Sequence, residues 1–121
     1  MPSRRVLVVD DNADIANLTA LLLESHGCEV ATALDGRAAL EQAARNWPDV
    51  VFLDLNLPGM DGFEIARQLR AQQGDRPLKI VVLSGYVDQA THERAAEAGV
   101  DAVMEKQGEI DSLEASLSSF L

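Results

Sequence analysis

The stretch DVVFLDLNLPGMDG, residues 49–62, decides how this chain folds. Its apolar run, residues 50–53, is short and unbroken, which is typical of a strand buried on both faces of a parallel sheet. The run stops at Asp54, and the proline and glycines that follow predict a turn before a helix begins. Asp54 is therefore expected at the carboxyl end of a central strand, which is where ligands bind in parallel α/β sheets.

Apolar runs and helix-length segments alternate along the rest of the chain. Each segment carries its own start or stop signal, such as an aspartate at its beginning or a glycine after its end. Strict alternation predicts an α/β fold with a five-stranded parallel sheet flanked by five helices. The 121 residues are expected to form a single domain, 1–121. The expected strands are 6–9, 29–32, 50–53, 80–83 and 102–104, and the expected helices are 12–25, 36–45, 62–72, 89–98 and 109–120.

Composition narrows the range of functions. The formal net charge is −10, so direct nucleic-acid binding is not expected, whereas divalent cations and basic partner surfaces are favoured. No apolar run approaches the roughly 20 residues of a membrane span, and a secretory signal peptide is not expected either. Cys28 is the only cysteine, which is compatible with a reducing cytoplasm.

Polar side chains follow several of the expected strands. Asp10 and Asp11 follow the first, Asp54 the third, Ser84 the fourth and Lys106 the fifth. If the first and third strands are neighbours, three carboxylates share one crevice. Two unit charges about 4 Å apart repel by ~4 kcal/mol at an effective dielectric of about 20. Either one carboxyl group is protonated or a cation lies among them.

Oxygen ligands of this kind suit Mg²⁺, which retains several waters and binds beside phosphates. The backbone carbonyl of Asn56 is a plausible further ligand. The whole set suits one reaction, in which a carboxylate attacks a phosphoryl group and forms an acyl phosphate. Lys106 and the metal would neutralise the transferring oxygens, and the hydroxyl of Ser84 would donate to one of them. Each residue also has a simpler interpretation: Asp10 and Asp11 as helix-start residues, Ser84 as a turn hydroxyl and Lys106 as a solvated lysine.

In its combined pattern the sequence resembles a response-regulator receiver domain of two-component signalling, similar to chemotaxis regulators. The pattern is the acidic pair, Asp-x-x-x-Pro-Gly-Met-Asp-Gly at residues 54–62, Ser-Gly-Tyr at residues 84–86 and the lysine after the fifth strand. The resemblance implies the flavodoxin-like, doubly wound strand order 2-1-3-4-5. It implies that Asp54 accepts phosphate from a histidine kinase or a histidine phosphotransfer protein, and that Asp10, Asp11, Asp54 and the Asn56 carbonyl hold Mg²⁺.

The same resemblance implies that Ser84 and Lys106 report the phosphoryl group to a downstream protein through the surface of the fourth helix, fifth strand and fifth helix. The resemblance also implies that the protein is cytoplasmic and does not turn over a separate substrate. Two positions depart from the family pattern. Gln107 replaces the proline that usually follows the lysine, and Val103 stands where an aromatic switch residue is common. Tyr86 is a weaker candidate for that switch role.

Alternative functions stay open on the sequence. Gln107 and Val103 favour a receiver-fold interaction module that has weak or lost phosphate switching. A flavin carrier would need a hydroxyl-rich phosphate loop after the first strand, where the sequence has Asp10 and Asp11. A phosphatase of the Asp-x-Asp type would need a second aspartate where Asn56 stands. The chain could act as a stand-alone regulator or as the receiver of a larger hybrid kinase.

Overall fold

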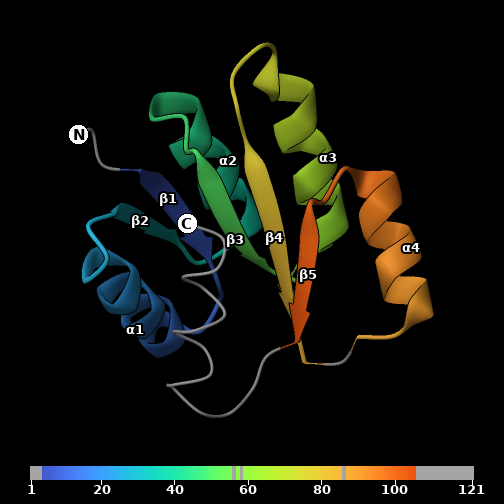
Figure 1. Ribbon diagram of the computed structural model, residues 1–121, viewed down its shortest axis with the longest axis horizontal. Helices are drawn as coiled ribbons and strands as arrows, with labels where there is room; N and C mark the ends of the chain where they lie inside the picture. Colours follow the sequence, from blue (N-terminus) through green and yellow to red (C-terminus); the bar gives the residue numbers. More distant parts are fainter. Residues whose placement is uncertain (1–3, 56, 58, 86, 106–121) are drawn as a thin grey trace.

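The computed structural model describes residues 4–55, 57, 59–85 and 87–105, and its centre is a five-stranded parallel sheet (Figure 1). The strand order is β2-β1-β3-β4-β5, as expected from the family resemblance. The bounds of the elements are β1 Arg5–Val9, α1 Ala13–Glu24, β2 Glu29–Ala33, α2 Gly36–Arg45, β3 Val50–Asp54, α3 Gly62–Gln73, β4 Lys79–Ser84, α4 Gln89–Ala98 and β5 Ala102–Glu105. The expected fifth helix, 109–120, lies outside the described residues.

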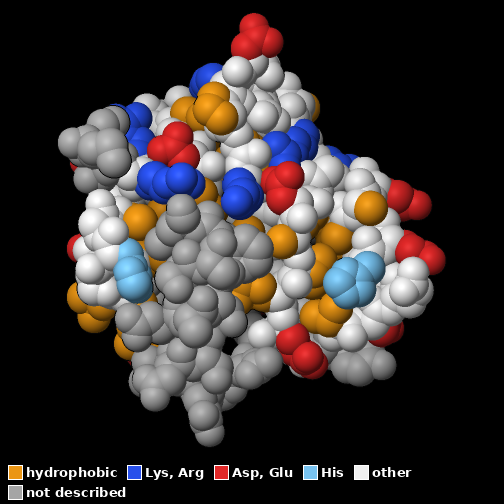
Figure 2. Space-filling view, in the orientation of Figure 1, with side chains coloured by type: hydrophobic (Ala, Val, Ile, Leu, Met, Phe, Trp, Pro, Cys, Tyr) orange, Lys and Arg blue, Asp and Glu red, His pale blue; other side chains and the backbone are white. Residues whose placement is uncertain are grey.

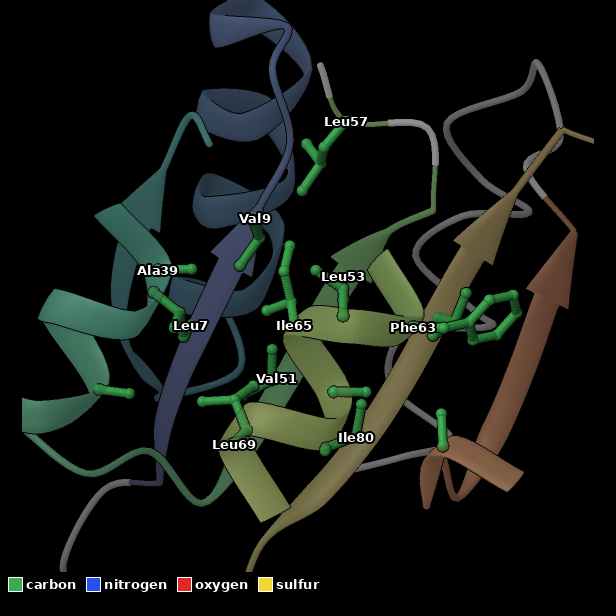
Figure 3. Packing of buried hydrophobic residues seen from close by; sticks show 14 of the residues in the cluster. Leu7, Val9, Ala39, Val51, Leu53, Leu57, Phe63, Ile65, Leu69 and Ile80 are labelled. Atoms are coloured by element: carbon green, nitrogen blue, oxygen red, sulfur yellow. The ribbon is translucent and has the colours of Figure 1, made fainter. Parts of the chain in front are cut away.

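The two faces of the sheet form two separate hydrophobic clusters. Along β1, Leu7 and Val9 face one cluster while Val6 and Val8 face the other, as the two-residue period of a strand requires. The larger cluster lies between the sheet and helices α2, α3 and α4. Figure 3 shows side chains of α3, among them Ile65 and Leu69, packed with side chains of the central strands. All five residues of β3 are buried, which confirms a strand covered on both faces.

Each described helix begins at a polar side chain that accepts hydrogen bonds from the first turn. Asn12 accepts from the backbone of Asp14 and Ile15, and the aspartates before α2, α3 and α4 act in the same way. Glu64 stands three residues after Asp61, which is the spacing of a reciprocal capping pair. Asp61 does cap α3, but the Glu64 carboxylate accepts from Arg67 and Gln68 further along the helix.

Helix α1 buries a different face from the one its larger apolar residues define. The sequence places Ile15, Leu18 and Leu22 on one stripe, yet the buried residues are Ala16, Thr19, Ala20 and Leu23. Ile15 is 40 % exposed. Small side chains allow the helix axis to approach the sheet closely, and Thr19 satisfies its hydroxyl by donating to the Ile15 carbonyl 2.8 Å away. The size of the side chains, and not only their polarity, therefore decides which stripe meets the sheet.

Candidate functional site

Asp54 is the last residue of β3 and lies at the carboxyl edge of the sheet. Its neighbour Leu53 pairs with Val9 of β1, so the residue after β1, Asp10, lies beside Asp54. The backbone N–H of Asp10 donates to Ala33 at the end of β2 over 3.0 Å. The parallel register therefore brings the ends of three strands to one rim, at the point where the strand order reverses.

Three carboxylates converge at this rim. Oxygen atoms of Asp10, Asp11 and Asp54 all lie within 4.8 Å of one another. Asp10 and Asp54 are only 3 % and 4 % exposed, whereas Asp11 faces solvent. An oxygen of Asp10 accepts a hydrogen bond from the backbone N–H of Asn12 over 3.0 Å, which holds its orientation. Helix capping is carried by Asn12, so Asp10 and Asp11 are not needed as caps.

Ser84 occupies the end of the neighbouring strand. Asp54 pairs with Leu83 of β4, and the backbone N–H of Leu55 donates to the Leu83 carbonyl over 2.9 Å. Ser84 comes directly after Leu83 and is 4 % exposed. Its own partner across the sheet is Glu105, the last residue of β5. The hydroxyl-bearing residue is therefore placed one strand away from the carboxylates, at the same edge of the sheet.

The donor set fits a small divalent cation. Mg²⁺ binds oxygen atoms at about 2.0–2.1 Å, so two of its ligands on opposite sides are about 4 Å apart. The three carboxylates, within 4.8 Å of one another, can meet this requirement after small side-chain rotations. A bound cation would also remove the repulsion between three negative charges at one point.

The structure leaves several expected site residues untested. Lys106, Tyr86 and the Asn56 carbonyl lie outside the described residues. Val103 is described: it pairs with Val82 of β4 and packs, half-buried, against the larger hydrophobic cluster. The position at which the family pattern commonly has an aromatic residue is therefore occupied by an aliphatic residue. It packs on the side of the sheet that α4 covers.

Two features near Asp54 have no signal in the sequence. Gly62 lies against the end of β3, since a Cβ atom added to it would be 3.1 Å from the Asp54 carbonyl oxygen. The carboxylate of Asp61 receives the guanidinium of Arg94, on α4, at 2.7 Å. That guanidinium also lies over the Phe63 ring, 4.7 Å from its centroid. The pairing residues are 33 positions apart, and local patterns do not reveal such contacts.

The opposite end of the sheet carries charged side chains of both signs, with Glu29 and Asp49 beside basic residues. A hollow of about 840 Å³ lies there at the start of β1, β3 and β4, and Arg4, Arg5 and Lys79 are among its lining residues. Figure 2 shows Lys and Arg side chains over the upper part of the molecule, with Asp and Glu side chains among them. This hollow is distant from Asp54, because a five-residue strand spans about 16 Å. It is therefore separate from the carboxylate site.

The fold and the site together define a doubly wound α/β domain with an acidic, cation-compatible pocket at its topological switch point. The chain belongs to the response regulator receiver domain family, whose model matches residues 6–118. It is thus a receiver domain of two-component signal transduction. Among its described helices, none combines the length and apolar character needed to cross a bilayer.

Individual relatives agree with this assignment. The transcriptional regulatory protein PrrA of Mycobacterium tuberculosis is 38 % identical over 119 residues, which cover 98 % of this chain and 50 % of PrrA. The chain therefore spans about half the length of that relative. The structure is similar to that of the Vibrio cholerae chemotaxis protein CheY4, with a TM-score of 0.90 and 30 % identity. The matched region covers 99 % of this chain and 100 % of the CheY4 chain. The structure also resembles a BeF3-activated DrrB receiver domain, at a TM-score of 0.82 and 26 % identity over 98 % of this chain and 97 % of that one.

Proposed function

We propose that Asp54 is the phosphoacceptor of this receiver. The observation that carries the proposal is the convergence of Asp10, Asp11 and Asp54 within 4.8 Å at the end of β3. An oxygen of Asp54 attacks the phosphorus of a phosphohistidine on a kinase or phosphotransfer protein. The new O–P bond forms as the N–P bond breaks, and the imidazole leaves with the electron pair. The product is an acyl phosphate on Asp54.

The other residues at the rim position and neutralise the group that is transferred. Asp10, Asp11 and Asp54, with the Asn56 carbonyl, would hold Mg²⁺, which supplies positive charge to the phosphoryl oxygens. The Ser84 hydroxyl donates a hydrogen bond to one of these oxygens, and Lys106 adds a positive charge. Tyr86 and Val103 remain the weaker candidates for a switch role, and Val103 has no ring that could rotate.

Membership of the receiver family supports proposals about partners and location. We infer a histidine kinase or histidine phosphotransfer protein as the donor, a downstream protein that contacts the surface of α4, β5 and the segment after β5, and a cytoplasmic setting. We also propose that residues 1–121 form a single receiver domain. The strongly negative charge of the chain disfavours direct contact with nucleic acid by this domain.

Phosphorylation by acetyl phosphate in the presence of Mg²⁺ tests the proposal. Intact mass spectrometry is expected to show a labile gain of one phosphoryl group, which is lost in Asp54→Asn. Asp49→Asn is a matched control because Asp49 is exposed and directly precedes β3, at the end opposite Asp54. A wild-type protein that gains no mass, or an Asp54→Asn protein that still does, would overturn the assignment of Asp54.

One observation favours a second candidate function. Val103 is aliphatic and packs against the core, so the domain could bind partners on the receiver fold with weak or no phosphate switching. The same mass measurement separates the two candidates, because an interaction module of this kind would bind its partner without gaining a phosphoryl group.

A further inference from the structure

The ion pair between Arg94 and Asp61 joins helix α4 to the segment that follows Asp54. A guanidinium nitrogen of Arg94 lies 2.7 Å from one carboxylate oxygen of Asp61. The other oxygen of Asp61 accepts the backbone N–H of Phe63 over 2.9 Å and caps α3. One aspartate therefore binds the first turn of α3 and the side of α4 at the same time.

Phe63 reinforces this connection. Its ring is fully buried in the larger hydrophobic cluster, together with Ala95 and Ala98 of α4. The guanidinium of Arg94 lies over the ring at 4.7 Å from the centroid, a geometry that attracts a cation to the aromatic face. The only fully buried residues of α4 are the two alanines, which offer little apolar area. Arg94 therefore adds an ion pair and a cation–π contact to the small apolar contact between α4 and α3.

The other end of the connection reaches Asp54 through backbone contacts. Gly62 lies between Asp61 and Phe63, and a Cβ atom on it would be 3.0 Å from the Cα of Leu55 and 3.1 Å from the Asp54 carbonyl oxygen. The first turn of α3 thus rests directly on the backbone of the phosphoacceptor. A shift of the Asp54 backbone would be passed to Asp61 and Phe63, because close-packed backbone has little room to deform.

We propose that Arg94 is a positioning residue that couples the state of Asp54 to the orientation of helix α4. The inference rests on the proposed function of Asp54. The route runs from Asp54 through Gly62 to Asp61 and Phe63, and from there to Arg94. It gives this chain a means of signalling that does not require an aromatic residue at position 103, which is valine here.

The energetic character of the pair suits such a role. The side chains of Arg94 and Asp61 are 55 % and 46 % exposed, and exposed ion pairs contribute little to folding stability. A contact of this kind can break and re-form as α4 shifts without unfolding the domain. Coupling between two sites typically changes an affinity about 5-fold or more, which a pair combined with a cation–π contact can supply.

Hydrogen–deuterium exchange of α4 with saturating Mg²⁺ and beryllofluoride tests the coupling. In the wild-type protein, the ligand is expected to change exchange both in the segment after Asp54 and in α4. In Arg94→Gln, the segment after Asp54 should respond as before, whereas the response of α4 should fall to half or less. Asp61→Asn should behave like Arg94→Gln, because asparagine keeps the helix cap but loses the charge.

Two further variants separate coupling from general damage. Arg67→Gln removes a cation and an exposed ion pair with Glu64 on α3, and it should leave the response of α4 unchanged. Arg94→Lys keeps the positive charge and should restore at least half of the response. A purely structural role of Arg94 would instead raise exchange in α4 equally with and without ligand.

Each result bears on a distinct claim. If the wild-type segment after Asp54 does not respond to the ligand, the proposed function fails and the coupling fails with it. If that segment responds but α4 does not, or if Arg94→Gln follows the wild type in α4, only the coupling is wrong. Loss of beryllofluoride binding in Arg94→Gln would also overturn it, because Arg94 would then act on the site itself.

Discussion

Gly62 lies directly against the carbonyl oxygen of Asp54, and a Cβ atom added to Gly62 would come within 3.1 Å of it. The same Cβ atom would be 3.0 Å from the Cα of Leu55. Both contacts are with backbone, which cannot move aside as the end of a flexible side chain can. The glycine therefore sets how closely helix α3 approaches the strand that carries Asp54.

Gly62→Ala is expected to destabilise the domain by about 1–2 kcal/mol. Overpacking costs about 1–3 kcal/mol, and the better helix propensity of alanine offsets up to about 1 kcal/mol. Urea unfolding measures the change. In the same variant, phosphorylation by acetyl phosphate should slow because the backbone of Asp54 is displaced. Gly85→Ala is the control for stability, since a Cβ atom there meets nothing within 4 Å. Equal stability of the two variants would contradict the close-approach argument.

Asp11→Asn is expected to weaken Mg²⁺ binding by tenfold or more. Asp11 is the exposed member of the carboxylate cluster, so its replacement removes a ligand charge without leaving a buried group unpaired. Calorimetric titration with Mg²⁺ measures the affinity, and a chelator should abolish phosphorylation of the wild type. Asp14→Asn is the matched control because Asp14 is exposed in the first turn of α1. An unchanged affinity in Asp11→Asn would remove Asp11 from the metal site.

Arg70→Ala is expected to destabilise the domain by about 2–3 kcal/mol. The guanidinium of Arg70 donates to the carbonyls of Gly99 and Leu78 over 2.8 and 2.9 Å, and contacts Asp101 at 2.6 Å. Asp101 in turn accepts the backbone N–H of Ile80 over 2.7 Å. Removal of the Arg70 guanidinium leaves these acceptors without their donor. Partly buried acceptors without a hydrogen bond lower the free energy of unfolding.

Two control variants sharpen this test in urea unfolding. Arg70→Lys should recover only a small part of the loss, because a single ammonium group cannot reach three separated acceptors. Arg67→Ala removes an exposed ion pair with Glu64 on the same helix and should change stability by less than about 0.5 kcal/mol. Equal losses of unfolding free energy in Arg67→Ala and Arg70→Ala would show that the network around Arg70 stabilises the domain no more than an exposed ion pair does.

Acid is expected to loosen the start of α4 through Asp88. The backbone N–H of Thr91, and then its hydroxyl, donate to the Asp88 carboxylate and hold its pKa below the ordinary value of 3.8. A lowered folded-state pKa means that the contribution of Asp88 to stability is complete above pH 3.8. That contribution is lost as the pH falls through the lower, folded-state value.

Carbon-13 NMR titration of the Asp88 carboxyl group measures this pKa directly. Amide exchange in the first turn of α4 should rise at the same acidic pH. Asp88→Asn provides the comparison, since asparagine also caps a helix but does not titrate. The difference in exchange between the two proteins isolates Asp88 from the other acidic groups. A midpoint at or above 3.8 would contradict the capping explanation.

The local signals in the sequence predicted the described elements closely. The apolar runs gave the five strands to within one or two residues, and aspartates preceding α2, α3 and α4 proved to be the helix caps. Asp10, Asp11 and Asp54 were predicted to share a crevice, and their oxygens do meet. These predictions succeed because strand and helix periodicity, capping and parallel topology depend on neighbouring residues and on a small set of sheet rules.

Contacts between elements distant in the sequence were not foreseen. The burial of Ala16, Thr19, Ala20 and Leu23 on α1, in place of the stripe of larger residues, depends on how closely the helix lies to the sheet. The pairing of Arg94 with Asp61 depends on where α4 crosses α3. Lys106 stays a prediction, because it lies outside the described residues.

By itself the sequence determined the order of strands and helices and the gathering of acidic residues at one edge of the sheet. Both follow from hydrophobic periodicity and from the fact that parallel strands end on the same side. Only the tertiary structure decided how closely Gly62 approaches the backbone of Asp54 and which residue pairs with Arg94. Those contacts depend on distances between packed backbones, and side-chain chemistry along the chain does not encode such distances locally.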